Sequence, residues 1–97
     1  MEKRRDKRYK TRQIAKVGGK LGVVNDVSSH GIQISTAFSP KERKIDISFE
    51  LYGNMIQVIG IIRWIKWNQK LKALNQLGVI IENAPPEFKR FIAEFES

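Results

Sequence analysis

The chain has 97 residues, of which 41% are hydrophobic, with a net charge of +8 and no cysteine. That length accommodates one small domain with a single core. The absence of cysteine excludes disulfides and thiolate metal sites. No apolar run reaches the roughly 18 residues of a membrane span, and no apolar stretch follows the charged N-terminus. We therefore expect a cytoplasmic protein that has no membrane partner.

Positive charge is concentrated at the start of the chain. Residues 1–20 carry nine Lys or Arg against two acidic residues, a net charge of +7, and the rest of the chain carries only +1. Residues 1–10 contain almost no apolar side chains, so we expect them to form a flexible basic arm. Such an arm attracts an anionic partner, although charge alone leaves open a tail that only aids solubility.

The residues after this arm follow a pattern that is typical of short strands. Residues 14–17 and 21–27 are rich in apolar and β-branched side chains, and Gly18-Gly19 between them predicts a tight hairpin turn. A third run begins after Gly31, with Ile32, Ile34 and Thr36 in alternation. Three strands are therefore expected before residue 37.

Three further strands are expected in the second half of the chain. Residues 45–51 alternate apolar and polar side chains at every step, which is the pattern of a half-buried strand. The long apolar stretch 55–67 is interrupted by Gly60, which predicts a bulge or sharp bend there. Trp64 lies among isoleucines in this stretch and is expected in the core. Residues 77–81 form the last predicted strand.

The end of the chain changes to a helical period. Four apolar residues fall at spacings i, i+3, i+4 and i+7, namely Phe88, Phe91, Ile92 and Phe95. That spacing places them on one face of a helix. Pro85-Pro86 can begin this helix because a proline in the first turn loses no helical hydrogen bond, and Asn83 is a candidate cap.

Together these elements predict a mainly all-β fold in a single domain over residues 1–97. The barrel spans residues 12–82 and has about six antiparallel strands, a number that favours a closed or nearly closed barrel and so removes exposed strand edges. One amphipathic helix over residues 85–96 follows the barrel and packs on it.

The sequence offers no candidate catalytic or metal centre. The single histidine, His30, stands in a Ser-Ser-His-Gly turn without a cluster of His, Cys or carboxylate groups beside it. No serine has a candidate base, and no Gly-rich phosphate loop is present. We therefore expect a protein that is not an enzyme, with no catalytic residues, no metal site and no cofactor.

Two local patterns of polar residues remain. The first is an R-x-x-x-R spacing near the start of the chain, and the second is a D-x-S-x-x-G pattern in a turn between strands. They comprise Arg4, Arg5 and Arg8, and Asp26, Ser28 and Gly31. Arginine pairs arise by chance in a basic chain, and Asp, Ser and Gly are ordinary turn residues. Their occurrence together and in this order is more specific than either pattern alone.

In these two motifs the chain resembles the PilZ domain family. That family carries R-x-x-x-R on an N-terminal segment and [D/N]-x-S-x-x-G in a barrel, and residues 61–65 and 77–81 look like its late strands. The resemblance implies a six-stranded antiparallel barrel with a C-terminal helix that binds the bacterial second messenger cyclic di-GMP. It assigns ligand binding to Arg4, Arg5, Arg8, Asp26, Ser28 and Gly31.

The residue types in these motifs suit a ligand with two phosphates and two guanines. A guanidinium group pairs bidentately with phosphate oxygens or with guanine O6 and N7, and its plane stacks on bases. Asp26 and Ser28 can accept hydrogen bonds from the N–H edge of guanine. Gly31 lets the backbone approach a base or adopt positive φ. We expect the arm to close over the face with Asp26, and a downstream protein partner to recognise that change.

Two other functions stay open. A small basic barrel can bind RNA or single-stranded DNA, but such barrels interleave basic groups with exposed aromatic rings, and the basic segment contains only Tyr9. A PilZ-like adaptor could instead bind only a protein, through Trp67, Tyr52 or the helix. We favour cyclic di-GMP as the ligand and expect no nucleic-acid partner.

Overall fold

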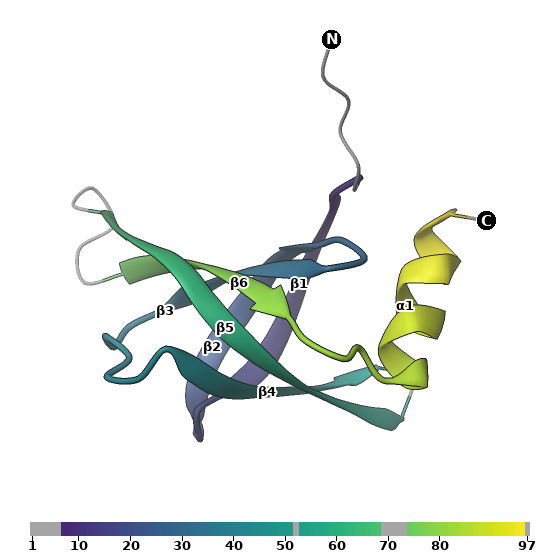
Figure 1. Cartoon of the computed structure of the whole chain (residues 1–97), viewed down its shortest axis with the longest axis horizontal. Helices are drawn as coiled ribbons and strands as arrows, with labels where there is room; N and C mark the ends of the chain where they lie inside the picture. Colours follow the sequence, from purple (N-terminus) through teal and green to yellow (C-terminus); the bar gives the residue numbers. More distant parts are fainter. Residues whose placement is uncertain (1–6, 52, 69–73, 97) are drawn as a thin grey trace, which may run out of the picture.

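The computed structural model describes residues 7–51, 53–68 and 74–96 of the chain. Six antiparallel strands form a closed barrel in the order β1-β2-β3-β6-β5-β4, and one helix follows (Figure 1). This confirms the predicted fold class. The elements are β1 (Tyr9–Val17), β2 (Lys20–Val27), β3 (Gly31–Thr36), β4 (Lys44–Leu51), β5 (Asn54–Asn68), β6 (Leu74–Ile81) and α1 (Pro86–Glu96).

The first hairpin forms where the glycine pair predicts it. Gly18 and Gly19 have φ angles of 61° and 87°, which residues with a side chain rarely adopt, and they connect β1 to β2. β1 itself begins at Tyr9, five residues before the predicted start at Ile14. Two residues of the predicted arm, Tyr9 and Lys10, therefore belong to the barrel, and residues 1–6 lie outside the described part of the chain.

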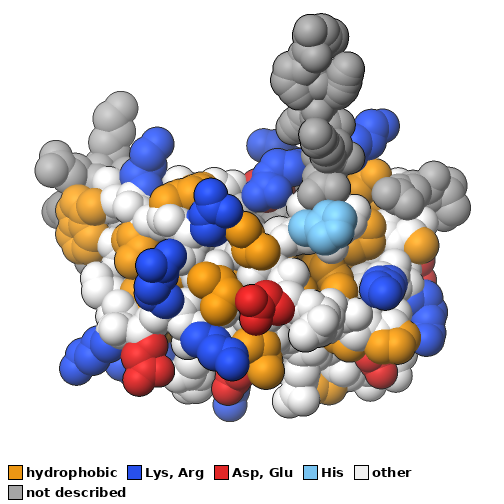
Figure 2. All heavy atoms as spheres, in the orientation of Figure 1, with side chains coloured by type: hydrophobic (Ala, Val, Ile, Leu, Met, Phe, Trp, Pro, Cys, Tyr) orange, Lys and Arg blue, Asp and Glu red, His pale blue; other side chains and the backbone are white. Residues whose placement is uncertain are grey.

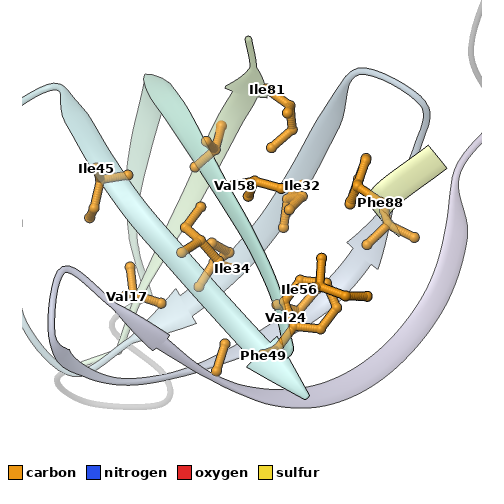
Figure 3. Close-up of a cluster of buried hydrophobic side chains, with 14 of the residues drawn as sticks. Val17, Val24, Ile32, Ile34, Ile45, Phe49, Ile56, Val58, Ile81 and Phe88 are labelled. Atoms are coloured by element: carbon orange, nitrogen blue, oxygen red, sulfur yellow. The ribbon is translucent and has the colours of Figure 1, made fainter. Parts of the chain in front are cut away.

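Aliphatic side chains fill the interior of the barrel. They alternate along the strands with exposed residues and converge from all six strands, as Figure 3 shows. The labelled members of this core are Val17, Val24, Ile32, Ile34, Ile45, Phe49, Ile56, Val58, Ile81 and Phe88. Each fully buried aliphatic side chain contributes about 1.5–3 kcal/mol of transfer free energy, so this core is the main source of stability.

The helix α1 packs against one end of the barrel (Figure 1). Phe88, Phe91 and Ile92 are buried, whereas Phe95 is 37% exposed, so three of the four predicted apolar positions face the core. The ring of Phe91 lies 5.5 Å from the ring of Phe49 on β4. Phe95 stacks on Tyr9 of β1 at 5.1 Å. Aromatic side chains therefore attach the helix to β4 and to the start of β1.

The start of α1 differs in one detail from the prediction. Pro86 is the first helical residue, and the carbonyl of Pro85 accepts hydrogen bonds from the backbone N–H of Phe88 and Lys89 at 3.0 and 3.1 Å. Asn83 lies two residues before Pro85 and has a positive φ of 49°, so it occupies a turn and is not the cap. No helix in the described residues is long and apolar enough to cross a membrane.

The bulge in β5 lies at Arg63 and not at Gly60, where the sequence predicted it. Ile62 pairs with Val79 and Trp64 with the next residue, Gly78, which leaves Arg63 as the extra residue. Gly60 pairs regularly with strands on both sides. A Cβ atom at Gly60 would lie 2.2 Å from Cγ1 of Val79, so this glycine serves close packing and not a bend.

Candidate functional site

The turn that carries the D-x-S-x-x-G pattern connects β2 to β3 and is closed by Ser28. The backbone N–H of Ser28 donates to the carbonyl oxygen of Gly31 at 2.9 Å, and the Ser28 hydroxyl donates to the same oxygen at 3.4 Å. Ser28 is 2% exposed. Its hydroxyl is thus a structural group of the turn, and its predicted contact with a ligand stays a prediction.

Arg8 extends from the start of β1 to this turn. Its Nε lies 3.2 Å from Oδ1 of Asp26, and its Nη1 donates to the hydroxyl of Ser28 at 3.4 Å. These contacts join the second arginine of the R-x-x-x-R spacing to two residues of the other motif. The Arg8 side chain remains 42% exposed, so part of its guanidinium group faces solvent and is free to contact an anion.

One carboxylate oxygen of Asp26 accepts no hydrogen bond from the described residues. Its Oδ1 is buried and accepts no hydrogen bond with acceptable geometry from the described part of the chain. The 3.2 Å contact with Arg8 Nε meets the distance of an ion pair, but it does not provide a well-directed hydrogen bond. A buried carboxylate oxygen without a donor is costly. Asp26 can therefore gain from a ligand that brings an N–H group.

Gly31 is required for packing. Its φ angle is not among the positive ones, so the predicted left-handed conformation does not occur here. A Cβ atom at this position would lie 3.1 Å from the carbonyl oxygen of Val79 and 3.8 Å from Nη1 of Arg8. A side chain would thus press on β6 and occupy space beside the guanidinium group.

Three of these motif residues, Arg8, Ser28 and Gly31, line a surface pocket of about 340 Å³. Three elements of the barrel and the β2–β3 turn contribute to its walls. The lining residues are Arg8, Ser28, His30, Gly31, Arg63, Trp64, Gly78, Val79 and Ile80. Three of these side chains, those of His30, Arg63 and Trp64, were not predicted to lie at the site.

Trp64 is on the surface and not in the core. It is 43% exposed and lies opposite Gly78, whose outward face its indole covers. A Cβ atom at Gly78 would come within 2.2 Å of the indole ring, so the ring rests flat on glycine backbone. The physical reason is the bulge at Arg63, because one extra residue reverses the faces of all the residues that follow it.

A larger pocket of about 520 Å³ lies elsewhere, between the outer face of β4 and β5 and the segment before α1. The charged groups in its lining are Lys44, Asp46 and Glu82. One lysine beside two carboxylates does not favour an anionic ligand. The smaller pocket has the chemistry of an anion site, because Arg8 and Arg63 both line it.

The structure brings four of the six motif residues together, namely Arg8, Asp26, Ser28 and Gly31. Arg4 and Arg5 lie outside the described residues, so their predicted role stays a prediction. Within residues 7–51, 53–68 and 74–96, no group of three or more His, Cys, Asp or Glu side chains is placed to hold a metal ion.

Comparisons with known proteins give one informative result. No protein-family model matches the chain, and no curated protein matches it either. Among solved structures, the chain is similar to the Bacillus subtilis inhibitor of motility, MotI/DgrA, with a TM-score of 0.75 at 10% sequence identity. The match covers 98% of this chain and 49% of that chain, so this chain spans about half its length. At this identity the similarity shows the fold.

The fold and the site together define a class of protein. A closed barrel of six antiparallel strands ends in one helix and has an arginine-lined pocket at the β2–β3 turn. The architecture agrees with the PilZ-like fold that the sequence motifs imply, and the similarity to MotI/DgrA supports that fold.

Proposed function

We propose that this protein is a non-catalytic receptor for cyclic di-GMP, which it binds in the pocket at the β2–β3 turn. The observation that carries the proposal is the pair of contacts from Arg8 to Asp26 and Ser28. These contacts join residues about twenty positions apart in the chain, and Arg8 and Ser28 both line the pocket. The described arginine of the first motif therefore contacts the second motif in space.

Arg8 is suited to the anionic part of this ligand. Its guanidinium group is held by two contacts, yet the side chain is 42% exposed and lines the pocket. A held guanidinium loses little conformational entropy when it pairs with phosphate or with guanine O6 and N7. Arg4 and Arg5 precede it in the sequence and would supply further positive charge to the second phosphate.

Asp26 and Trp64 are suited to the guanine base. The buried Oδ1 of Asp26 lacks a hydrogen-bond donor among the described residues, and guanine offers two N–H donors on its Watson–Crick edge. Trp64 presents a supported, partly exposed ring beside the same pocket. Stacking of a base on such a ring contributes about 1–3 kcal/mol. Adenine lacks this N–H pattern, so selectivity for guanine follows.

One observation favours the rival function of binding single-stranded RNA or DNA. Trp64 and Trp67 are 43% and 54% exposed on β5, with Lys66 between them, and exposed rings beside basic groups form stacking surfaces. However, Trp64 pairs with Gly78 of β6, on the outer face of the barrel. Trp67 pairs with Asn75 of β6, whose side chain is buried and faces inward. The two rings thus lie on opposite faces of the strand and cannot stack successive bases along one path.

Isothermal titration calorimetry tests the proposal. The protein is titrated with cyclic di-GMP, and with cyclic di-AMP and GTP as controls for the base and for the cyclic dinucleotide. We expect saturable binding of cyclic di-GMP only. A short single-stranded oligonucleotide serves as a fourth ligand. Tighter and strongly salt-dependent binding of the oligonucleotide would replace our proposal with the rival one.

A further inference from the structure

Two further side chains with N–H donors line the pocket, and neither is a specified residue of the two sequence motifs. His30 is an exposed residue of the β2–β3 turn, and Arg63 is the exposed extra residue of the bulge in β5. Both line the same pocket as Arg8. Figure 2 shows the histidine side chain at the surface, on a face with several Lys and Arg side chains. These two residues come from different elements than Arg8, so they extend the N–H donors over a separate part of the wall.

The backbone around both residues is fixed. The carbonyl oxygen of His30 accepts a hydrogen bond from the backbone N–H of Ile81 at 2.9 Å, which ties the turn to β6. Arg63 is held between Ile62 and Trp64, each of which pairs with β6. The two side chains therefore project from rigid positions, and a rigid site binds with a smaller entropic cost than a mobile one.

We propose that His30 and Arg63 form a second anion-binding subsite of this pocket, which contacts a phosphate of the bound dinucleotide. The inference rests on the proposed function and deepens it. A cyclic dinucleotide carries two negative charges, and Arg8 is placed to pair closely with one of them. The guanidinium group of Arg63 and the ring N–H of His30 are placed to contact the other, in addition to the charge of Arg4 and Arg5.

The two residues offer different contacts to a phosphate. Arg63 supplies a fixed positive charge and a planar set of N–H donors. The imidazole ring of His30 supplies a hydrogen-bond donor. The other charged groups at this site are Arg8 in the pocket lining and Asp26 in its ion pair with Arg8.

Calorimetric titration of the full chain with cyclic di-GMP tests this subsite. Arg63→Gln keeps a polar side chain without the charge, and it should weaken binding about tenfold, the size of one lost charge-assisted hydrogen bond. His30→Ala removes the ring donor and should also weaken binding about tenfold.

Each outcome separates the subsite from the proposed function. Unchanged binding by both variants overturns the subsite and leaves the receptor function standing. Unchanged binding by only one of them removes that residue from the subsite. Absence of cyclic di-GMP binding by the natural chain overturns the receptor function itself, and the subsite with it.

Discussion

Arg8 is the residue on which the site depends most. It joins the β2–β3 turn through Asp26 and Ser28 and still presents an exposed guanidinium group to the pocket. The sequence could indicate this residue because the spacing from Arg4 and the later D-x-S-x-x-G pattern are both local. It could not indicate the unsatisfied Oδ1 of Asp26, which depends on burial in the folded chain.

Replacing Arg8 by alanine should weaken binding of cyclic di-GMP at least about tenfold, since one bidentate arginine contact is lost. The melting temperature should change little, because the Arg8 side chain is 42% exposed and its contact with Asp26 is not a well-directed hydrogen bond. Arg12→Ala is the matched control, since Arg12 is an exposed basic residue of β1 that does not line the pocket. Calorimetry and thermal melts measure both quantities. Equal losses of affinity in the two variants would indicate a general charge effect and not a site.

The two tryptophans of β5 provide a second matched pair. Trp64→Ala should weaken cyclic di-GMP binding about tenfold, because a base loses its stacking partner. Trp67→Ala should leave the affinity unchanged, since Trp67 faces the other side of the strand and does not line the pocket. Competitive titration of both variants gives the comparison. An effect of Trp67 as large as that of Trp64 would favour an extended nucleic-acid surface instead.

At the scale of elements, the long strand β5 shows where prediction from sequence reaches its limit. The alternation in residues 45–51 predicts β4 correctly because every inward side chain in it is apolar. In β5 the alternation of apolar and polar residues predicts a regular strand that continues through Arg63 without a bulge. The bulge depends on pairing with β6, which no local pattern encodes, and it moves Trp64 from the expected core to the surface.

The start of β1 was missed for a related reason. Tyr9 and Thr11 alternate with exposed basic residues, so the sequence pattern of this segment predicts a polar arm. The inner face of this part of β1 is covered by α1, because the ring of Phe95 stacks on Tyr9 at 5.1 Å. The first residues of β1 also pair with β2, Tyr9 with Val27 and Lys10 with Asp26. Both the pairing and the contact with the helix join residues far apart in the chain, and a local sequence pattern does not encode them.

Close packing between β5 and β6 gives a prediction about stability. Gly60→Ala places a methyl group within 2.2 Å of Cγ1 of Val79, so we expect a loss of about 1–3 kcal/mol in the free energy of unfolding. The double variant Gly60→Ala/Val79→Ala removes the clash and should lose less than the sum of the two single variants. Urea denaturation measures all three. Strict additivity would show that the contact is not the cause.

The helix α1 gives a second stability prediction. Phe88 is fully buried and lies in the barrel core, as Figure 3 shows, so Phe88→Ala should destabilise the fold by about 3–5 kcal/mol. Phe95 is 37% exposed, so Phe95→Ala should lower the free energy of unfolding clearly less than Phe88→Ala does. Chemical denaturation of both variants tests this order. A greater loss for Phe95 would mean that its stack on Tyr9, and not the buried face, holds the helix.

At the scale of the whole molecule, the charge distribution and the barrel act together. The chain carries +8, of which +7 lies in residues 1–20, and Arg8 in this segment reaches the pocket. The barrel is a rigid support that holds the β2–β3 turn and the bulge of β5 next to each other. The basic segment raises the local concentration of an anionic ligand, and the turn supplies the groups that select guanine.

From this arrangement we predict that salt weakens the affinity for cyclic di-GMP but does not abolish binding. Raising the NaCl concentration from about 50 mM to about 500 mM should weaken cyclic di-GMP binding severalfold, because exposed charges are screened at the higher concentration. Binding should remain measurable, since contacts to Asp26 and Trp64 do not depend on screening to the same extent. Calorimetry at both salt concentrations measures the change. A complete loss at the higher concentration would point to attraction by charge alone.

The most direct test of the site is chemical-shift mapping of the ¹⁵N-labelled protein with cyclic di-GMP. We predict that the amide signals of Arg8, Asp26 and Gly31 and the indole signal of Trp64 shift on titration. The indole signal of Trp67 and the amides around Lys44 and Glu82 should stay in place. No shift at all, or shifts confined to the pocket between β4, β5 and the start of α1, would contradict the account.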